Sequence, residues 1–169
     1  MQFRDLLPDD GAKLLEFESA NRGWFEKTVE ARKEEFYSLK GIEAHIAECL
    51  AGYAGGTLHP LVMTDAAGEI TGRANLRFID AVKGNCEIGY RIAELHCGHG
   101  WASASVRHMQ QLAYGTWGLS HIVAYASVEN LASARVLEKN SFVREELIKE
   151  RSTVHQRKID AYRYIHTAA

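Results

Sequence analysis

Apolar residues change their spacing about a third of the way along the chain. Before Gly55 and Gly56 they recur every three or four residues, as on one face of a helix. This spacing predicts short helices over residues 12–20, 23–31 and 41–53. A strand over residues 1–7 is predicted ahead of them, because the turn residues Pro8 to Gly11 end it.

After Gly56, runs rich in apolar and β-branched residues, bounded by turn residues, favour strands. Strands are predicted over residues 60–64, 70–80, 85–92, 121–126, 142–153 and 159–166. Helices are predicted over residues 101–117 and 130–140. The first three of these strands are expected to be adjacent and antiparallel. This order predicts one domain over residues 1–169, an α+β sheet with helices on its faces.

Composition and charge narrow the classes of function. Hydrophobic residues make up 46% of the chain and charged residues 25%, as in an ordinary globular domain. Apolar runs are too short to cross a bilayer, and early acidic residues disfavour a signal peptide. The formal charge of -2 disfavours a nucleic-acid partner and mildly favours a cationic amine. We therefore expect no direct contact with nucleic acid and no membrane.

Cysteine and histidine usage indicates free thiols rather than disulfides or a metal site. Cys49, Cys86 and Cys97 are odd in number and widely spaced, so a reducing, cytoplasmic location is expected. His96, Cys97 and His99 lie close together, but they cannot easily converge on one ion and lack a second half-site. No metal is expected. A monomer and a homodimer are both compatible with the sequence.

A glycine loop follows the predicted strand over residues 85–92 and opens the next helix. Gly98 and Gly100 allow a close approach of the backbone to a ligand and tolerate positive φ. The first N–H groups of the helix lack intrahelical partners and lie at the positive end of its dipole. The loop therefore predicts a phosphate site, with a simple turn as the alternative. Its spacing matches neither the dinucleotide fingerprint nor the P-loop.

The loop and two flanking motifs resemble the GCN5-related N-acetyltransferase (GNAT) superfamily. The loop Cys97-Gly98-His99-Gly100-Trp101-Ala102 is similar to the coenzyme A signature Gln/Arg-x-x-Gly-x-Gly/Ala. Upstream, Glu87-Ile88-Gly89-Tyr90 resembles a strand of the RimJ/RimL-like branch, the ribosomal-protein N-terminal acetyltransferases. Downstream, the helix motif of that branch is matched at Asn130, Ser133, Arg135, Val136, Leu137, Glu138, Lys139 and Phe142. The resemblance covers about residues 60–166.

The resemblance implies the GNAT fold, a mixed, mostly antiparallel sheet of about seven strands with helices on both faces. It implies acetyl-CoA as co-substrate and no metal. The residues that it places at the coenzyme are Tyr90, Ile92, Cys97, Gly98, His99, Gly100, Trp101, Ala102, Ser103, Asn130, Ser133 and Arg135. Asn130 can also cap a helix, and Arg135 is either a phosphate contact or a solvated residue. Cys97 replaces a long polar side chain, but backbone donors supply most of such a site.

The resemblance also implies direct attack of an amine on the thioester, without an acyl-enzyme. The main-chain N–H of Tyr90 corresponds to the carbonyl contact, a preorganised donor that a splay of the strand at Gly89 would expose. Glu87 and Glu150 are candidates for the general base, or for holding a water that acts as one; each is alternatively a solvated or ion-paired strand residue. Ser133 is the candidate proton donor to the thiolate, or bonds its own helix backbone.

The acceptor is expected to be a primary amine, most like the N-terminal α-amine of a protein. An α-amine with a pKa near ~7.7 to 8.0 is roughly a tenth neutral at pH 7, whereas a lysine near ~10.4 is almost entirely charged. An α-amine therefore needs little help from a base. The alternatives are a small amine, such as a polyamine, an amino sugar or an antibiotic, and a coenzyme A-binding module without turnover. The lack of a dense acidic cluster disfavours polyamines.

Overall fold

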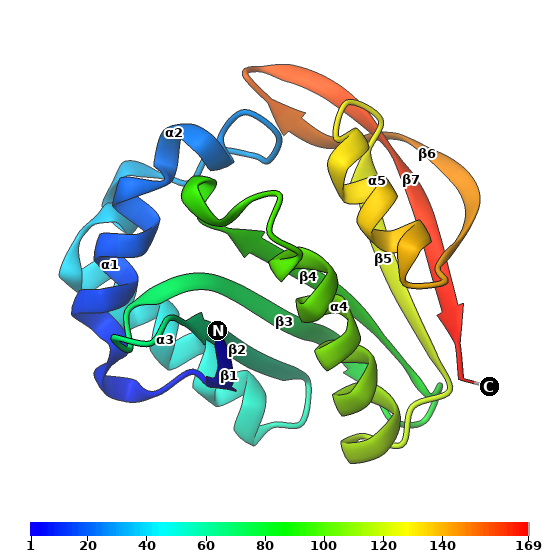
Figure 1. The fold of residues 1–169 in the computed structure, drawn as a ribbon, viewed down its shortest axis with the longest axis horizontal. Coiled ribbons are helices and arrows are strands. Elements are labelled where there is room, and N and C mark those ends of the chain that lie inside the picture. The colour runs from blue at the N-terminus through cyan, green and yellow to red at the C-terminus, as the bar shows by residue number, and fades with distance from the viewer. Residues whose placement is uncertain (169) are drawn as a thin grey trace.

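A computed structural model describes residues 1–168. Seven strands form one sheet in the order β1-β2-β3-β4-β5-β7-β6 (Figure 1). Their bounds are β1 Gln2–Asp5, β2 Leu58–Thr64, β3 Ile70–Asp80, β4 Asn85–Ile92, β5 His121–Ser127, β6 Val143–Val154 and β7 Arg157–Thr167. All neighbouring pairs are antiparallel except β4 and β5, which are parallel. The predicted α+β class and mostly antiparallel seven-stranded sheet are confirmed.

Helices cover both faces of this sheet. They are α1 Gly11–Ala20, α2 Arg22–Phe25, α3 Leu39–Ala54, α4 Trp101–Gln111 and α5 Leu131–Lys139. Short 3-10 turns cover Pro8–Asp10, Glu34–Tyr37 and Glu94–His96. Helices α4 and α5 lie in front of the sheet in Figure 1 and share one hydrophobic core with it, whereas α1, α2 and α3 contribute to a second core.

Alternation of side chains along the strands builds these two cores. In β2, Leu61 and Met63 pack in the core of α4 and α5, while Val62 between them packs in the core of α1 and α3. All three side chains are nearly or fully buried. Because successive strand residues point to opposite faces, one apolar run serves both layers.

The predicted helix over residues 23–31 is wrong for most of its length. Only Arg22–Phe25 is helical, and the N–H groups of Thr28 and Val29 both bond back to the carbonyl of Phe25 as the chain leaves the helix. These two β-branched residues have lower helix propensity than the unbranched residues before them. The segment after α2 is therefore free to run as a loop beside the sheet.

Two further element ends differ from the prediction. The helix predicted over residues 101–117 is α-helical only to Gln111 and continues as a π-turn over Leu112–Thr116, closed by Trp117 N to Leu112 O at 3.0 Å. The last hairpin turns at His155 and Gln156, both at positive φ (47° and 61°), as a two-residue turn with positive φ at both positions requires. His-Gln carries none of the usual sequence signals for such a turn.

Candidate active site

The centre of the sheet is split where β4 and β5 diverge. The two strands pair only from Asn85 and His121 to Ile88 and Ala124. Beyond that point β4 stays with β3, and β5 stays with β7. The divergence begins at Gly89, as the sequence predicted, and leaves a gap between two adjacent parallel strands.

Main-chain N–H groups of β4 point into this gap. Ala93 N donates to Thr71 O of the β3 side at 2.9 Å. Because N–H directions alternate along a strand, those of Tyr90 and Ile92 point the other way, toward the side that β5 has left. Both N–H groups are thus directed where a ligand in the gap could accept from them; their predicted contacts, that of Tyr90 with a thioester carbonyl and that of Ile92 with the coenzyme, stay predictions.

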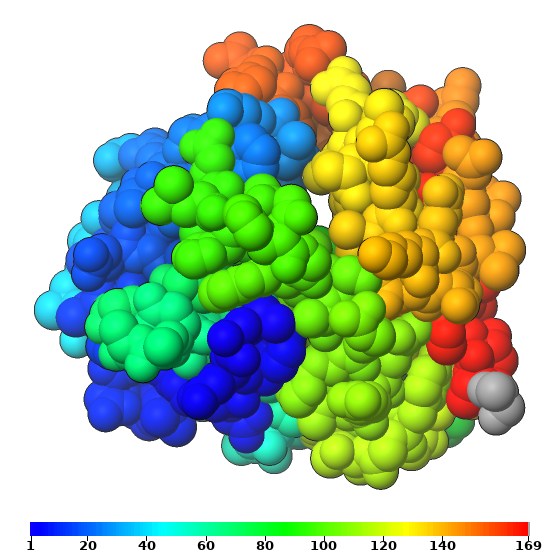
Figure 2. All heavy atoms as spheres, in the orientation of Figure 1, coloured from blue at the N-terminus to red at the C-terminus, as the bar shows by residue number. Residues whose placement is uncertain are grey.

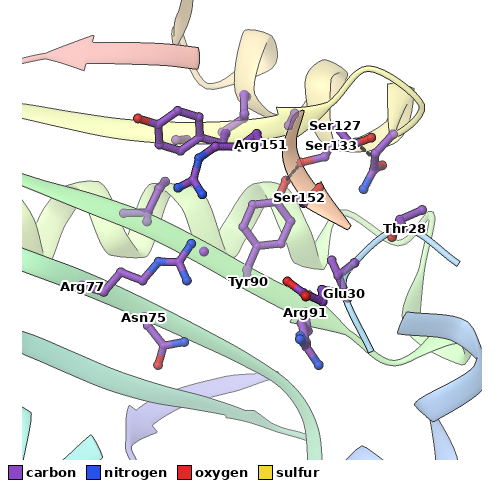
Figure 3. A pocket seen from close by; sticks show the side chains of 18 of the residues that line it. Thr28, Glu30, Asn75, Arg77, Tyr90, Arg91, Ser127, Ser133, Arg151 and Ser152 are labelled. Atoms are coloured by element: carbon purple, nitrogen blue, oxygen red, sulfur yellow. Dashed lines mark hydrogen bonds between the residues drawn. The ribbon is translucent and has the colours of Figure 1, made fainter. Parts of the chain in front are cut away.

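A cavity of about 390 Å³ occupies the gap and continues through the sheet. Its walls come from β3, β4, β5, β6, α5 and the loop after α2 (Figure 3). Figure 2 shows the surface hollowed between the green segment that follows β4 and the yellow helix α5. Segments far apart in the sequence therefore meet at one opening.

The wall formed by α5 carries uncharged polar groups. Asn130 caps α5 by accepting a hydrogen bond from Ser133 N at 3.0 Å, which confirms its predicted capping role. The hydroxyl groups of Ser133 and Tyr90 lie 3.1 Å apart and are hydrogen-bonded across the gap (Figure 3). Burial raises the pKa of Tyr90 to about 12, so this phenol stays protonated at neutral pH. The pair offers a partly buried O–H donor at the cavity.

The opposite wall carries positive charge. Five arginines line it: Arg32, Arg73, Arg77, Arg91 and Arg151. The fully buried carboxylate of Glu18 accepts from Arg73 at 2.5 Å and from Arg91 at 3.3 Å. Glu87 is ion-paired with Arg77 and, at 3.6 Å, with Arg151. Figure 3 shows Arg77 and Arg151 reaching into the same space from different strands.

The two carboxylates predicted as general base do not line the cavity. Glu87 stands behind it, with one oxygen at Arg77 and the other near Arg151. Glu150 is exposed, because a bulge between Ile148 and Ser152 gives it a positive φ of 52° and displaces it from the regular register. Glu87 and Glu150 therefore lie outside the cavity lining, and their role as general base stays a prediction.

The glycine loop at the mouth of the gap is open. Gly98 and Gly100 have φ of 80° and 82°, and a Cβ built on either would meet nothing within 4 Å. Gly100 precedes α4 with no side-chain cap, and the first intrahelical bond runs from Ala104 N to Gly100 O at 2.9 Å. The N–H groups of residues 101–103 thus have no intrahelical partner, as an anion site requires.

The remaining loop side chains are engaged within the protein or point to solvent. Cys97 and His99 are exposed, and Cys97 Sγ contacts Ala93 O at 3.5 Å. The Trp101 ring stacks on His96, with centroids 4.2 Å apart.

Two other residues predicted at the coenzyme are Ser103 on α4, which is buried, and Arg135 on α5, which is exposed. The buried Ser103 hydroxyl accepts from Arg107 at 3.1 Å and from Asn140 at 2.9 Å, so both of its acceptor positions are used within the protein. Arg135 is exposed on α5, and no carboxylate within residues 1–168 forms an ion pair with it.

The arginine wall was missed from the sequence. Arg73 and Arg77 lie four residues apart in a strand, and Arg91 lies in the next strand. Charged residues inside otherwise apolar strands were the available signal, because burial of a charge requires a partner or a function.

Nothing in the described part of the chain indicates a metal centre or a membrane span. No three His, Cys, Asp or Glu side chains in residues 1–168 are grouped so that they could hold a metal ion. Over the same residues, no helix combines the length and apolar character needed to cross a membrane.

The splayed strands, the through-going cavity and the open glycine loop define an acetyltransferase of the GNAT class. A family model described as acetyltransferase (GNAT) domain matches residues 2–143, and the chain belongs to this family. A curated relative from Bacillus licheniformis, named uncharacterized N-acetyltransferase p20, is 29% identical over 61% of this chain. The chain spans only 58% of the length of that relative.

Solved structures share the complete fold. A ribosomal-protein-S5-alanine acetyltransferase from Vibrio fischeri superimposes with a TM-score of 0.93, at 18% identity, over 98% of this chain and 92% of its own. A spermidine N-acetyltransferase from Vibrio cholerae, in complex with CoA and spermine, gives 0.83 at 20% identity, over 98% and 94%. Since proteins with these different names share the architecture, the fold alone does not select the acceptor.

His45 gives the free energy of unfolding a pH dependence. Its ring accepts from Arg73 at 2.6 Å and is held neutral; burial and the charge of Arg73 lower the pKa of His45 from 6.5 to about 3. Below pH 6.5 the unfolded chain therefore takes up a proton that the native state refuses, so stability falls as pH decreases. We expect urea denaturation at pH 7, 6 and 5 to show a loss of about 1 kcal/mol per pH unit from this group.

The matched variants are His45→Gln, whose amide oxygen can accept the same bond, and His155→Asn at the exposed last turn. His45→Gln should make the free energy of unfolding depend less on pH between pH 7 and 5, and His155→Asn should keep the slope of wild type. An unchanged slope in His45→Gln would contradict the assignment.

Proposed function

We propose that this chain moves the acetyl group of acetyl-CoA directly to a primary amine, most like the N-terminal α-amine of a protein. The observation that carries the proposal is the gap between β4 and β5, into which Tyr90 N–H points, with the open glycine loop at its mouth. One end of this arrangement suits a pyrophosphate and the other suits an activated carbonyl.

The residues present fit the coenzyme. N–H groups of residues 98–103 would hold the pyrophosphate, because the space over both loop glycines is free of protein atoms. Ile92 would pair with the pantetheine arm along β4, and Asn130 lines the same passage. His99 in the glycine loop and Arg135 on α5 are both exposed, and we propose that their side chains contact phosphate groups of the coenzyme. Acetyl-CoA supplies a thioester, which is already activated toward an amine.

The chain's own groups then serve the charge changes of the transfer. Tyr90 N–H stabilises negative charge on the carbonyl oxygen as the nitrogen–carbon bond forms. When the carbon–sulfur bond breaks, the leaving sulfur takes a proton from the Ser133 hydroxyl, which at the same time regains one from the Tyr90 hydroxyl to which it is hydrogen-bonded, and water returns a proton to Tyr90. The proton lost by the amine passes to water, because Glu30, the carboxylate among the lining residues of the described cavity, is exposed to solvent.

The cavity supports an α-amine acceptor over a polyamine. The five arginines of the arginine wall repel a molecule with several positive charges. They also disfavour the protonated form of any single amine that enters the cavity. An α-amine needs only a small shift to become neutral at pH 7, whereas an alkyl amine needs a large one. The mildly acidic net charge of the chain, which favoured a cationic acceptor, is thus opposed by the local charge.

The test is release of free coenzyme A from acetyl-CoA in the presence of peptides with free N-termini. Wild type should turn over peptides and leave spermidine nearly untouched. Ser133→Ala should lower kcat about tenfold, a modest effect, because a thiol with pKa near 8.5 is a fair leaving group without its acid. Glu87→Gln should raise KM for the peptide through loss of its hold on Arg77 and Arg151.

Asn85→Asp, at the paired end of β4 outside the cavity, serves as a control that changes charge on the same strand. Tight binding of acetyl-CoA without thiol release from any amine would replace the proposed enzyme with a coenzyme A-binding module. Preferred turnover of spermidine would replace the α-amine with a polyamine.

A further inference from the structure

The arginine wall of the cavity carries more positive charges than there are carboxylates beside it to neutralise them. Its five arginines are matched by three carboxylates, Glu18 and Glu87 behind the wall and Glu30 on it. Glu18 is shared between two arginines, and so is Glu87. Glu30 is exposed. One arginine has no carboxylate at all.

That residue is Arg32, on the loop after α2. Its guanidinium lies over the Phe36 ring, 4.2 Å from the centroid, and it forms no ion pair within residues 1–168. Its Nε is buried and finds no hydrogen-bond partner among the described residues. Burial, and then the charges of Arg91 and Arg73, lower the pKa of Arg32 to about 10.

Such an arrangement is costly without a ligand. Like charges brought together in a partly desolvated cavity repel each other, and a buried donor without a partner costs free energy. A carboxylate in the cavity would offset the repulsion, because a guanidinium offers it charge-assisted and bidentate hydrogen bonds. Serine and amide groups on the α5 wall offer no comparable site for an anion.

We infer that the acceptor amine carries a carboxylate near the reacting nitrogen, and that Arg32, with Arg91 on the same wall, binds it. The inference rests on the proposed acetyl transfer and narrows its substrate class. With the carboxylate bound, the remaining arginines still disfavour the ammonium form of the amine. The wall thereby selects the acceptor and helps to keep its nitrogen neutral.

The carboxylate could come from two sources, the side chain of an acidic residue next to a protein N-terminus or the α-carboxylate of a small amino acid. The panel therefore contains the dipeptide amides Ser-Glu and Ser-Gln, free serine and spermidine, each measured by release of coenzyme A. Wild type should prefer Ser-Glu amide over Ser-Gln amide by about tenfold or more in kcat/KM, the size of one charge-assisted hydrogen bond. Free serine above Ser-Glu amide would identify the small-molecule source.

The variants are Arg32→Gln and, as a matched control, Lys33→Gln, which removes an exposed cation from the adjacent position. Arg32→Gln should lower kcat/KM for the acidic acceptors about tenfold and leave Ser-Gln amide within about twofold. It should also move the acidic limb of the pH profile of kcat for Ser-Gln amide to higher pH, because kcat reports the pKa of the bound amine; a purely structural role would not produce this change. Lys33→Gln should match wild type on every acceptor.

Equal kcat/KM of wild type for the two dipeptide amides would overturn the inference, and so would preference for spermidine; neither result depends on a variant that must fold. Absence of turnover for the whole panel would instead count against acetyl transfer itself. The two failures are thus distinguishable in one assay.

Discussion

Glu18→Gln is expected to lower the free energy of unfolding by about 3 kcal/mol or more, because removing one member of a buried ionic cluster leaves the others uncompensated. Glu18 is fully buried and is the shared partner of Arg73 and Arg91. An amide cannot neutralise either charge. Chemical denaturation should reveal the loss directly, and the melting temperature should fall by roughly 10 °C for a chain of this size.

The pH dependence of the same residue provides a second readout. Burial alone would raise the pKa of Glu18, but the charges of Arg73 and Arg91 and their hydrogen bonds lower it from 4.5. A carboxylate with a lowered native pKa adds stability above its unfolded pKa, and this contribution is lost as pH falls through the native value. Wild type should therefore lose stability below about pH 4.5, and Glu18→Gln should lose less there.

Glu16→Gln is the matched control, since Glu16 is exposed on the same helix. It should change stability by less than about 0.5 kcal/mol. If the two variants were equally stable, the ionic cluster would contribute nothing to the native state and the arginine wall would be held by packing alone.

The predictable part of the site is local in sequence. The glycines of the loop and the strand before them lie within about fifteen residues, and each acts through its own backbone: Gly89 where β4 departs from β5, Gly98 and Gly100 at positive φ. Backbone geometry of this kind follows from residue type. The capping of α5 by Asn130 was predictable for the same reason.

The parts that could not be predicted depend on contacts distant in sequence. Arg73 meets Glu18 across 55 positions, and Arg91 meets it across 73. No spacing rule joins a residue of α1 to residues of β3 and β4 that approach only after the sheet has formed. The position of Glu150 outside the cavity lining also could not be predicted, because the bulge that displaces it arises from the register between β6 and β7.

The α5 wall and the arginine wall of the cavity suit different parts of the proposed reaction. The α5 wall offers N–H and O–H donors without net charge, which suit a thioester and its leaving sulfur. The arginine wall suits an anionic group of the acceptor and disfavours a positively charged one. Since the split sheet separates them, each wall can change without disturbing the other. This separation is a physical reason why proteins of one architecture can take different acceptors.

The largest functional effect is expected at the phosphate loop, where Gly100→Val should raise the Kd for coenzyme A about 100-fold. Valine at a φ of 82° is strained, so the loop must rearrange, and two charge-assisted bonds from backbone N–H to phosphate are worth roughly this factor. Calorimetric titration with coenzyme A measures the change. Gly100→Ala should lie in between, because alanine tolerates this region at about 1–2 kcal/mol.

The control for this loss is a substrate without the pyrophosphate. S-acetylpantetheine retains the thioester and the arm that runs along β4 but has nothing for the N–H groups at the start of α4. Its kcat/KM should be the same in wild type and Gly100→Val to within about threefold, since a Cβ at this position meets no protein atom within 4 Å and position 100 lies outside the gap at Tyr90. A parallel loss with both substrates would mean that the substitution had closed the gap itself. Unchanged affinity for coenzyme A would show instead that these N–H groups do not bind its phosphates.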